Sequence, residues 1–285
     1  MSESAPVPGL FIDPLTMQPT DVPMLSPSTA DLIIGKSPLH AWFHKWGGEE
    51  PEYTEATDIG TIAHSLILGG ADVVPVEADS WRTNAAKAQR DAARAEGKLP
   101  ILVGKLDEVK ELVDHVAAYF LEHEISLSGA REAPVIWQER GVNVWCRGKL
   151  DHWLAPGILD LKFVANAHPG ACGKAAINYG YDIQAAAYTS AIETIYPEQA
   201  GRVRFLFCFV ETAPPYAITM ARPGGVMRAL GQAKWLRACE TWKRCLAEYG
   251  TEKPWPGYAE GVVDLDAPKW AIDNEAAIQD LEIIL

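Results

Sequence analysis

The hydrophobic period changes along this chain, and the change restricts the fold to a class that mixes helices with a sheet. Residues 132–163 read EAPVIWQERGVNVWCRGKLDHWLAPGILDLKF, a block rich in Val, Ile, Trp and Leu. The turn-like segments ERG and APG interrupt it. Apolar runs of this length between turn residues are typical of strands. The block therefore predicts three or four antiparallel strands.

Helical patterns lie on both sides of this block. They begin with Ser-Pro or end with Gly-Gly, or they carry apolar residues at i, i+3, i+4 and i+7. The helical patterns cover residues 26–46, 54–70, 81–122, 168–196 and 223–250. Residues 202–221 predict two further strands around Pro-Pro. This order predicts an α/β fold with a mixed, mainly antiparallel central sheet flanked by helices, and a helical N-terminal part.

The same patterns predict how the chain is organised. Residues 1–24 contain five prolines and little periodicity, so we expect an extended or disordered lead-in. We expect a single domain over residues 25–285. Its parts are a mainly helical segment at 25–125, a sheet with its helices at 131–222, a long helix at 223–250 and a tail at 251–285.

Composition excludes several classes of protein. Apolar residues make up 48% of the chain and charged residues 22%, as in soluble globular proteins. No apolar run approaches the roughly 20 residues that span a bilayer, and the N-terminus has no secretory pattern. We therefore expect a cytoplasmic protein without membrane contact. The five cysteines are scattered and never form C-x-x-C, which argues against disulfides, zinc ribbons and iron–sulfur clusters.

Three charged residues interrupt the apolar hairpin at residues 148–163: Asp151, Asp160 and Lys162. Side chains at i and i+2 of a strand share a face, so Asp160 and Lys162 are expected together, with Leu159 and Leu161 on the opposite face. The APG turn can return Asp151 to the same neighbourhood. Two carboxylates there make an oxygen site for Mg²⁺ or Mn²⁺, and a lysine beside it can orient or deprotonate a water. Considered alone, D-x-K is better explained by an ion pair on a half-exposed strand.

The wider arrangement resembles the PD-(D/E)xK nuclease superfamily, and specifically its exonuclease VIII (RecE-type, RecB-like) branch found in phage recombination operons. The resemblance extends from about Ser26 to Tyr249 and rests on blocks in a fixed order. They are SPLHAWFHKW with ATDIGTIAHSLIL, AEGKLPILVGKLDEVKELVDHVAAY, CRGKLDHW with GILDLKF, and GYDIQAAAYTSAI. The last block is similar to the Q-x-x-x-Y helix of RecB-like nucleases. Leu150 replaces the proline in the name of the superfamily.

The resemblance implies a set of site residues. His64, Asp151 and Asp160 are the implied metal ligands, and Lys162 is the implied catalytic lysine. Mg²⁺ is the expected ion, with Mn²⁺ as a substitute because a histidine softens the site. Gln184 and Tyr188, at i and i+4 of one helix, are expected to support the metal shell or hold DNA; packing within the helix layer is the alternative.

Several other charged residues are candidates for a role at the site. Arg147, Lys149 and Lys174 flank it and are candidates for contacts with DNA phosphates. A stripe at i, i+3 and i+7 is better explained as a solvated helix face; it consists of Lys87, Arg90 and Arg94. Glu132 and Glu139 are expected to be solvated, with an approach to the metal as the alternative.

The resulting hypothesis is a metal-dependent exonuclease that hydrolyses linear double-stranded DNA from 5′ to 3′ and leaves 3′ single strands for recombination. The resemblance implies double-stranded DNA ends, a single-strand annealing protein and further copies of the chain as partners. The formal net charge of -13 opposes DNA binding but leaves room for a local basic groove. Two alternatives remain: a RecB-like endonuclease or single-strand nuclease, and a catalytically inactive DNA-end-binding module.

Overall fold

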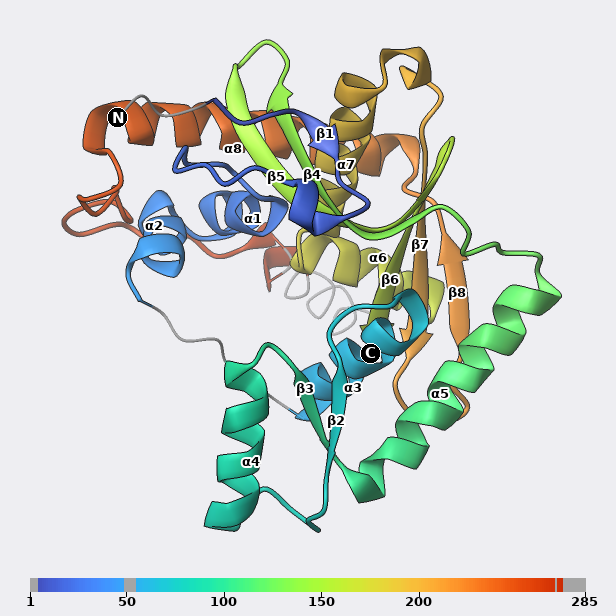
Figure 1. Ribbon diagram of the computed structural model, residues 1–285. Helices are drawn as coiled ribbons and strands as arrows, with labels where there is room; N and C mark the ends of the chain where they lie inside the picture. The colour runs from blue at the N-terminus through green and yellow to red at the C-terminus, as the bar shows by residue number, and fades with distance from the viewer. Residues whose placement is uncertain (1–4, 49–54, 270, 274–285) are drawn as a thin grey trace, which may run out of the picture.

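A six-stranded sheet with helices on both faces forms the centre of the computed structural model, which describes residues 5–48, 55–269 and 271–273 (Figure 1). The strand order is β1-β4-β5-β6-β7-β8, and every pair except β6–β7 is antiparallel. The structure confirms the predicted α/β fold with its mixed, mainly antiparallel sheet. The strands are β1 (Gly9–Leu10), β4 (Ala130–Glu139), β5 (Val144–Leu154), β6 (Gly157–Val164), β7 (Arg204–Glu211) and β8 (Ile218–Ala221).

Two apolar cores lie on the two faces of this sheet, as the alternation of the strands requires. One core joins the sheet to α1, α2, α6, α7 and α8, and the other joins it to α3 and α5. Leu159 and Leu161 belong to the second core, so the predicted alternation of β6 is confirmed. The helices are α1 (Pro27–Gly35), α2 (Pro38–Trp46), α3 (Glu55–Leu68), α4 (Asn84–Ala95), α5 (Val103–Glu122), α6 (Pro169–Asn178), α7 (Tyr181–Ile195) and α8 (Gly225–Tyr249), with short 3₁₀ turns at Pro14–Thr16 and Pro197–Gln199.

The parallel pairing of β6 with β7 places the crossover helices near the functional residues. Parallel neighbours cannot be joined by a tight turn, so the chain leaves β6, forms α6 and α7, and returns to begin β7. The carboxyl end of β6 therefore lies beside the start of this crossover. Such crevices at the carboxyl ends of strands are common ligand sites in α/β proteins.

Two segments differ from the sequence-based expectation. Part of the lead-in is an edge strand, because Gly9 and Leu10 of β1 pair with Ile136 and Val135 of β4. The N-terminal region, expected to be mainly helical, also contains a parallel two-stranded sheet of β2 (Val73–Val76) and β3 (Leu99–Leu102). Residues 1–4 and part of the predicted tail, residues 270 and 274–285, lie outside the described residues.

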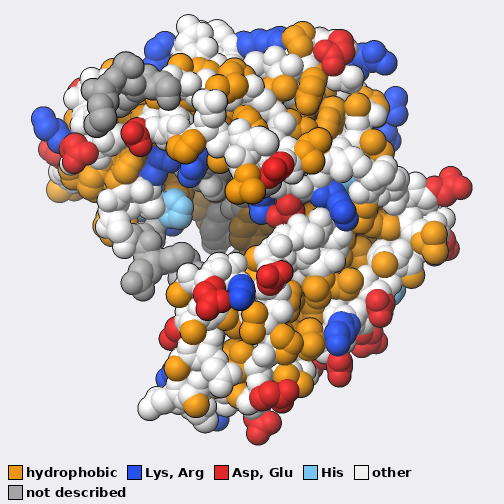
Figure 2. All heavy atoms as spheres, viewed as in Figure 1, with side chains coloured by type: hydrophobic (Ala, Val, Ile, Leu, Met, Phe, Trp, Pro, Cys, Tyr) orange, Lys and Arg blue, Asp and Glu red, His pale blue; other side chains and the backbone are white. Residues whose placement is uncertain are grey.

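The acidity of the chain is partly concentrated on one helix. α5 carries Asp107, Glu108, Glu111, Asp114 and Glu122, and Figure 2 shows acidic side chains over this helix. α5 packs on the sheet face opposite to α7 and α8. Within the described part of the chain, every helix is too short or too polar to cross a membrane.

Candidate active site

The site begins where β5 and β6 separate. These strands pair at His152–Leu154 with Gly157–Leu159, and Asp151 is the next residue of β5 beyond the pairs. The Oδ2 atom of Asp151 accepts a hydrogen bond of 2.8 Å from the backbone N–H of Leu161, which replaces the missing strand partner. Continuing the register brings Asp151 opposite Asp160. The carboxylates of Asp151 and Asp160 therefore lie together at the gap where β5 and β6 separate.

Asp160 and Lys162 form an ion pair next to this gap. The Nζ atom of Lys162 lies 2.7 Å from Asp160 Oδ2 and 4.5 Å from the ring centroid of Tyr181. The other oxygen of Asp160 accepts a hydrogen bond of 3.1 Å from Nε2 of Gln184. The Asp160 side chain is only 1% exposed, so these contacts fix both oxygens. The structure therefore brings Asp160, Lys162 and Gln184 together.

Burial changes the acidity of this pair. Burial raises the pKa of Asp160 to about 7; the Lys162 ammonium opposes that rise, and the Asp151 carboxylate adds to it. Burial alone would lower the pKa of Lys162, but Asp160 and Asp151 outweigh it and hold that pKa above its usual value. Lys162 is therefore a cation at neutral pH. It can donate hydrogen bonds to a phosphate or to a water molecule.

His64 of α3 reaches the same carboxylates from the other side. Its Nε2 atom lies 3.0 Å from Asp151 Oδ2, and its Nδ1 atom lies 3.4 Å from Glu132 Oε1. Burial lowers the pKa of His64, but the hydrogen bond to Asp151 and the charges of Asp151 and Glu132 outweigh burial and raise it. The structure thus places His64 at the site, far from Asp151 in sequence.

Glu132 belongs to the site, and the expectation that it is solvated was wrong. Its side chain is 14% exposed, its Oε2 atom pairs with Nζ of Lys149, and its Oε1 atom is buried without a hydrogen-bond partner. The backbone at Glu132 has a φ of 49°, which is rare for a residue with a side chain and often marks functional strain. This conformation within β4 directs the carboxylate toward His64.

His64, Glu132 and Asp151 fit a hard divalent cation. One ligand atom from each residue lies within 4.8 Å of the others. The 3.0 Å between His64 Nε2 and Asp151 Oδ2 is close to the separation of neighbouring ligands around an octahedral ion with bonds of about 2.1 Å. Glu132 Oε1, which has no hydrogen-bond partner, lies 3.4 Å from the other ring nitrogen of His64. Asp160 lies beside this cluster, with its oxygens directed to Lys162 and Gln184.

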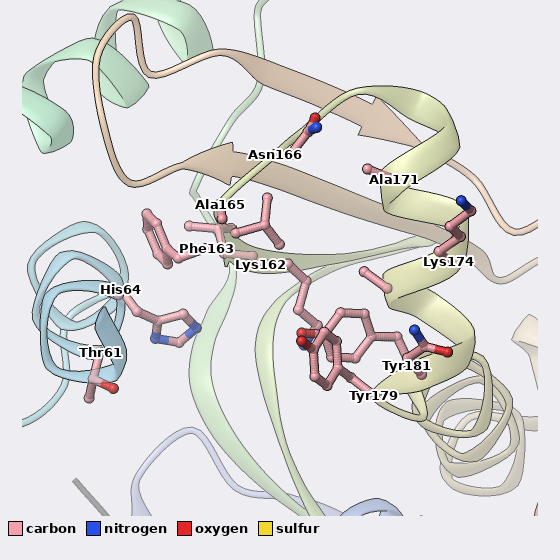
Figure 3. A pocket seen from close by; sticks show the side chains of 15 residues that line it. Thr61, His64, Lys162, Phe163, Ala165, Asn166, Ala171, Lys174, Tyr179 and Tyr181 are labelled. Atoms are coloured by element: carbon pink, nitrogen blue, oxygen red, sulfur yellow. The ribbon is translucent and has the colours of Figure 1, made fainter. Parts of the chain in front are cut away.

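A cleft of about 730 Å³ reaches this group, with His64 and Lys162 in its lining. Figure 3 shows His64 and Thr61 of α3 on one side, Lys174 of α6 with Tyr179 and Tyr181 on the other, and Lys162 between them. Asn166 and Asn178 add amide groups to its lining. Lys162 and Lys174 therefore line the same cleft.

The other predicted phosphate contacts lie outside this cleft. Lys149 is half exposed and pairs with Glu132 at the edge of the metal cluster. Arg147 is exposed two residues earlier on β5. It lies near Lys45, whose pKa is lowered to about 8 by burial and by the charge of Arg147. On α4, Arg90 of the stripe pairs with Asp91, as expected.

Tyr188 supports the backbone beneath the site. It is buried, which raises its pKa to about 12, and its Oη atom accepts a hydrogen bond of 3.3 Å from the backbone N–H of Lys149. A Cβ atom added to Gly148 would lie 2.4 Å from Cε1 of Tyr188, so the ring packs directly on β5. Tyr188 thus holds the strand that carries Asp151.

Glu139 is also buried, so the expectation that it is solvated was wrong. It is 3% exposed and accepts hydrogen bonds from the indoles of Trp137 and Trp235 and from the hydroxyl of Ser190. These partners join β4 to α7 and α8 and use both carboxylate oxygens. Glu139 is a structural residue away from the metal cluster.

Comparisons with known proteins agree with this geometry. A family model described as "PDDEXK-like domain of unknown function (DUF3799)" matches residues 33–262, and the chain belongs to this family. Its fold is similar to the crystal structure of a "putative exonuclease" from Eubacterium rectale, with 15% identity and a TM-score of 0.56. The match covers 89% of this chain and 93% of the other. No curated protein matches the sequence significantly. The chain is thus a member of the PD-(D/E)xK superfamily.

Proposed function

We propose that this chain is a metal-dependent DNA exonuclease. The observation that carries the proposal is that His64 and Lys162 line one cleft of a PDDEXK-like fold and contact the buried carboxylates of Asp151 and Asp160. Mg²⁺ is the expected ion, with Mn²⁺ as a substitute, because the donors are carboxylate oxygens and one imidazole.

The residues of the site have separate roles in the proposed hydrolysis. His64 and Asp151, with Glu132 or Asp160, would hold a divalent ion that polarises the scissile phosphate and the attacking water. Lys162, fixed between Asp160 and Tyr181, orients that water and stabilises the negative charge that develops on the phosphate. Lys174 binds the phosphate as it enters the cleft. The reaction is a direct hydrolysis without a covalent intermediate.

The finer assignment follows the resemblance to the exonuclease VIII branch. We propose linear double-stranded DNA as the substrate, degradation from 5′ to 3′, and release of a 3′ single strand for recombination. A single-strand annealing protein is the proposed partner for that product, and a homo-oligomer is the proposed assembly.

Cleavage of end-labelled DNA tests the proposal. Linear duplex labelled at the 5′ end of one strand and the 3′ end of the other is incubated with Mg²⁺, Mn²⁺ or EDTA, beside a closed circle. We expect metal-dependent release of the 5′ label and no cutting of the circle. Lys162→Ala should abolish release, whereas Lys87→Ala, which removes an exposed lysine of α4, should not.

Each other outcome contradicts a stated part of the proposal. Cutting of the circle would identify an endonuclease, and cleavage restricted to single strands would identify a single-strand nuclease. Early release of the 3′ label would show that degradation runs from 3′ to 5′. Binding of DNA ends without cleavage, with either metal, would identify an inactive binding module.

A further inference from the structure

An exposed tyrosine stands at the active cleft and has no part in the hydrolysis proposed above. Tyr179 follows α6 directly, lines the cleft and is 66% exposed. Figure 3 shows its ring near that of Tyr181, across the cleft from His64. Aromatic side chains contribute a large contact area when a partner covers them. The open ring of Tyr179 is therefore available to a ligand in the cleft.

The backbone around Tyr179 is held in place. Its N–H group donates a hydrogen bond of 2.9 Å to the backbone oxygen of Ala175, at the end of α6. Gly180 follows with a φ of 66°, a left-handed conformation that favours glycine, and is the N-cap of α7. A Cβ atom added to Gly180 would collide with the carboxylate of Asp31 in α1. A tightly packed corner between two helices therefore carries the Tyr179 ring.

Tyr179 is linked to the proposed catalytic lysine through a second ring. The ring centroids of Tyr179 and Tyr181 lie 5.8 Å apart, with 35° between the ring planes. The Nζ atom of Lys162 lies 4.5 Å from the Tyr181 centroid, so the Tyr179 ring is at most about 10 Å from this ammonium. A DNA strand that places a phosphate at Lys162 therefore brings a neighbouring base within reach of Tyr179.

The lining of the cleft suits the phosphates and bases of one DNA strand. Lys162 and Lys174 carry positive charge, and none of the lining residues that the structure describes is an aspartate or a glutamate, although the formal net charge of the chain is -13. Asn166 and Asn178 offer amide donors and acceptors to base edges. The volume of about 730 Å³ is typical of a pocket for a small ligand, so the cleft holds part of one strand rather than a base-paired duplex.

We propose that Tyr179 is a platform on which an unpaired base of the bound DNA strand stacks. Sites for single strands combine cations for the phosphates with aromatic rings for the bases, and this stacking tolerates every base. The stacked base positions the strand beside Lys162. Single-stranded DNA and an opened duplex end both supply such a base. The assignment rests on the proposed function in taking DNA as the ligand.

Binding of single-stranded DNA in EDTA tests this role without hydrolysis. The probes are a dye-labelled thymidine oligonucleotide and a strand of the same length with abasic sugars, and fluorescence anisotropy measures their affinities. Tyr179→Ala should weaken binding of the thymidine strand by about 5- to 150-fold, the range for the loss of one stacked base. Binding of the abasic strand should not change, because that strand has no base to stack. Tyr179→Phe keeps the ring and should bind the thymidine strand as the unmodified chain does.

Tyr258→Ala is the matched control. Tyr258 is 68% exposed and lies against His40, outside the lining of the cleft, so its removal should leave both affinities unchanged. Thermal melting of each variant confirms that it is folded before its affinity is compared. A blunt-ended duplex separates the two sources of the base. Weaker binding of this duplex by Tyr179→Ala assigns the base to an opened duplex end, and unchanged binding restricts the platform to single strands.

The proposal is overturned if Tyr179→Ala binds the thymidine strand as the unmodified chain does, or if this variant weakens the abasic strand equally. It is also overturned if Tyr179→Phe is as weak as Tyr179→Ala, or if the unmodified chain binds neither strand. A chain that binds DNA through Tyr179 but cleaves none contradicts the proposed nuclease and supports the platform. A chain that cleaves DNA but binds it equally well without the Tyr179 ring contradicts only the platform.

Discussion

Replacing Glu132 by glutamine should weaken metal binding while leaving the fold intact. The substitution keeps the shape of the side chain and removes the charge that lies 3.4 Å from Nδ1 of His64. The other ring nitrogen of His64 faces Asp151 at 3.0 Å, so Glu132 is positioned to hold the ring while Nε2 binds the ion. Carboxylates that orient a metal-binding histidine contribute about 10- to 100-fold in affinity, or roughly 1.4–2.8 kcal/mol.

Titration of the metal-free protein with Mn²⁺ measures this effect. Glu122→Gln removes the same charge from the exposed end of α5 and is the matched control. Lys149→Met should raise the affinity for Mn²⁺, because it removes a cation that pairs with Glu132. A loss well above 100-fold would identify Glu132 as a direct ligand. An affinity for Mn²⁺ within about twofold of the unmodified protein would refute the role of Glu132 at the metal.

Three further predictions concern packing, pH and the buried acid. Gly148→Ala should destabilise the protein by about 1–3 kcal/mol, because the new Cβ would lie 2.4 Å from the buried ring of Tyr188. Urea unfolding measures the loss, and an unchanged unfolding midpoint would contradict this packing. Affinity for Mn²⁺ should rise between about pH 5 and 8, because protons compete with the ion at two groups whose pKa is raised, His64 and Asp160, the latter to about 7. An affinity that does not change with pH would contradict this competition. Glu139→Ala should lower the free energy of unfolding by more than about 3 kcal/mol, because it leaves three buried donors without an acceptor. The folded variant should bind Mn²⁺ as the unmodified protein does; a loss of Mn²⁺ affinity would place Glu139 at the metal.

The central part of the site follows from local sequence patterns. Asp160 and Lys162 share a face because strands alternate with a period of two, and a tight turn returns Asp151 to them. His64 carries no such local signal, since it lies on a helix far from the hairpin and only the resemblance selects it. The approach of Glu132 to the metal was only the alternative expectation, because its position depends on a φ of 49°, which residue type does not indicate.

For the fold too, features set by neighbouring residues could be predicted, and features set by residues far apart in sequence could not. Helix caps and apolar periods are local, and they indicate most of the helices and strands. The direction of pairing is not local, so the parallel contact of β6 with β7 could not be distinguished from an antiparallel one. β1 has two residues, too few to show any period, and it was predicted only as part of an extended or disordered lead-in.

One face of α7 supports the reacting residues on two strands. Tyr181 lies over the ammonium of Lys162, and Gln184 donates a hydrogen bond to Asp160. Tyr188, on the same face, packs under Gly148 of β5. The Q-x-x-x-Y spacing therefore has two physical uses: the glutamine fixes the ion pair, and the tyrosine fixes the strand beside it.

The position of α7 is in turn fixed by contacts with α8. Asp182 pairs with Lys234, and a Cβ atom added to Gly231 would lie 2.2 Å from the backbone oxygen of Asp182, so the two helices meet without intervening side chains. The first turn of α7 also carries Tyr181, which lines the active cleft and lies over the ammonium of Lys162. Because Asp182 is the next residue of that turn, its ion pair with Lys234 of α8 holds Tyr181 in place beside Lys162.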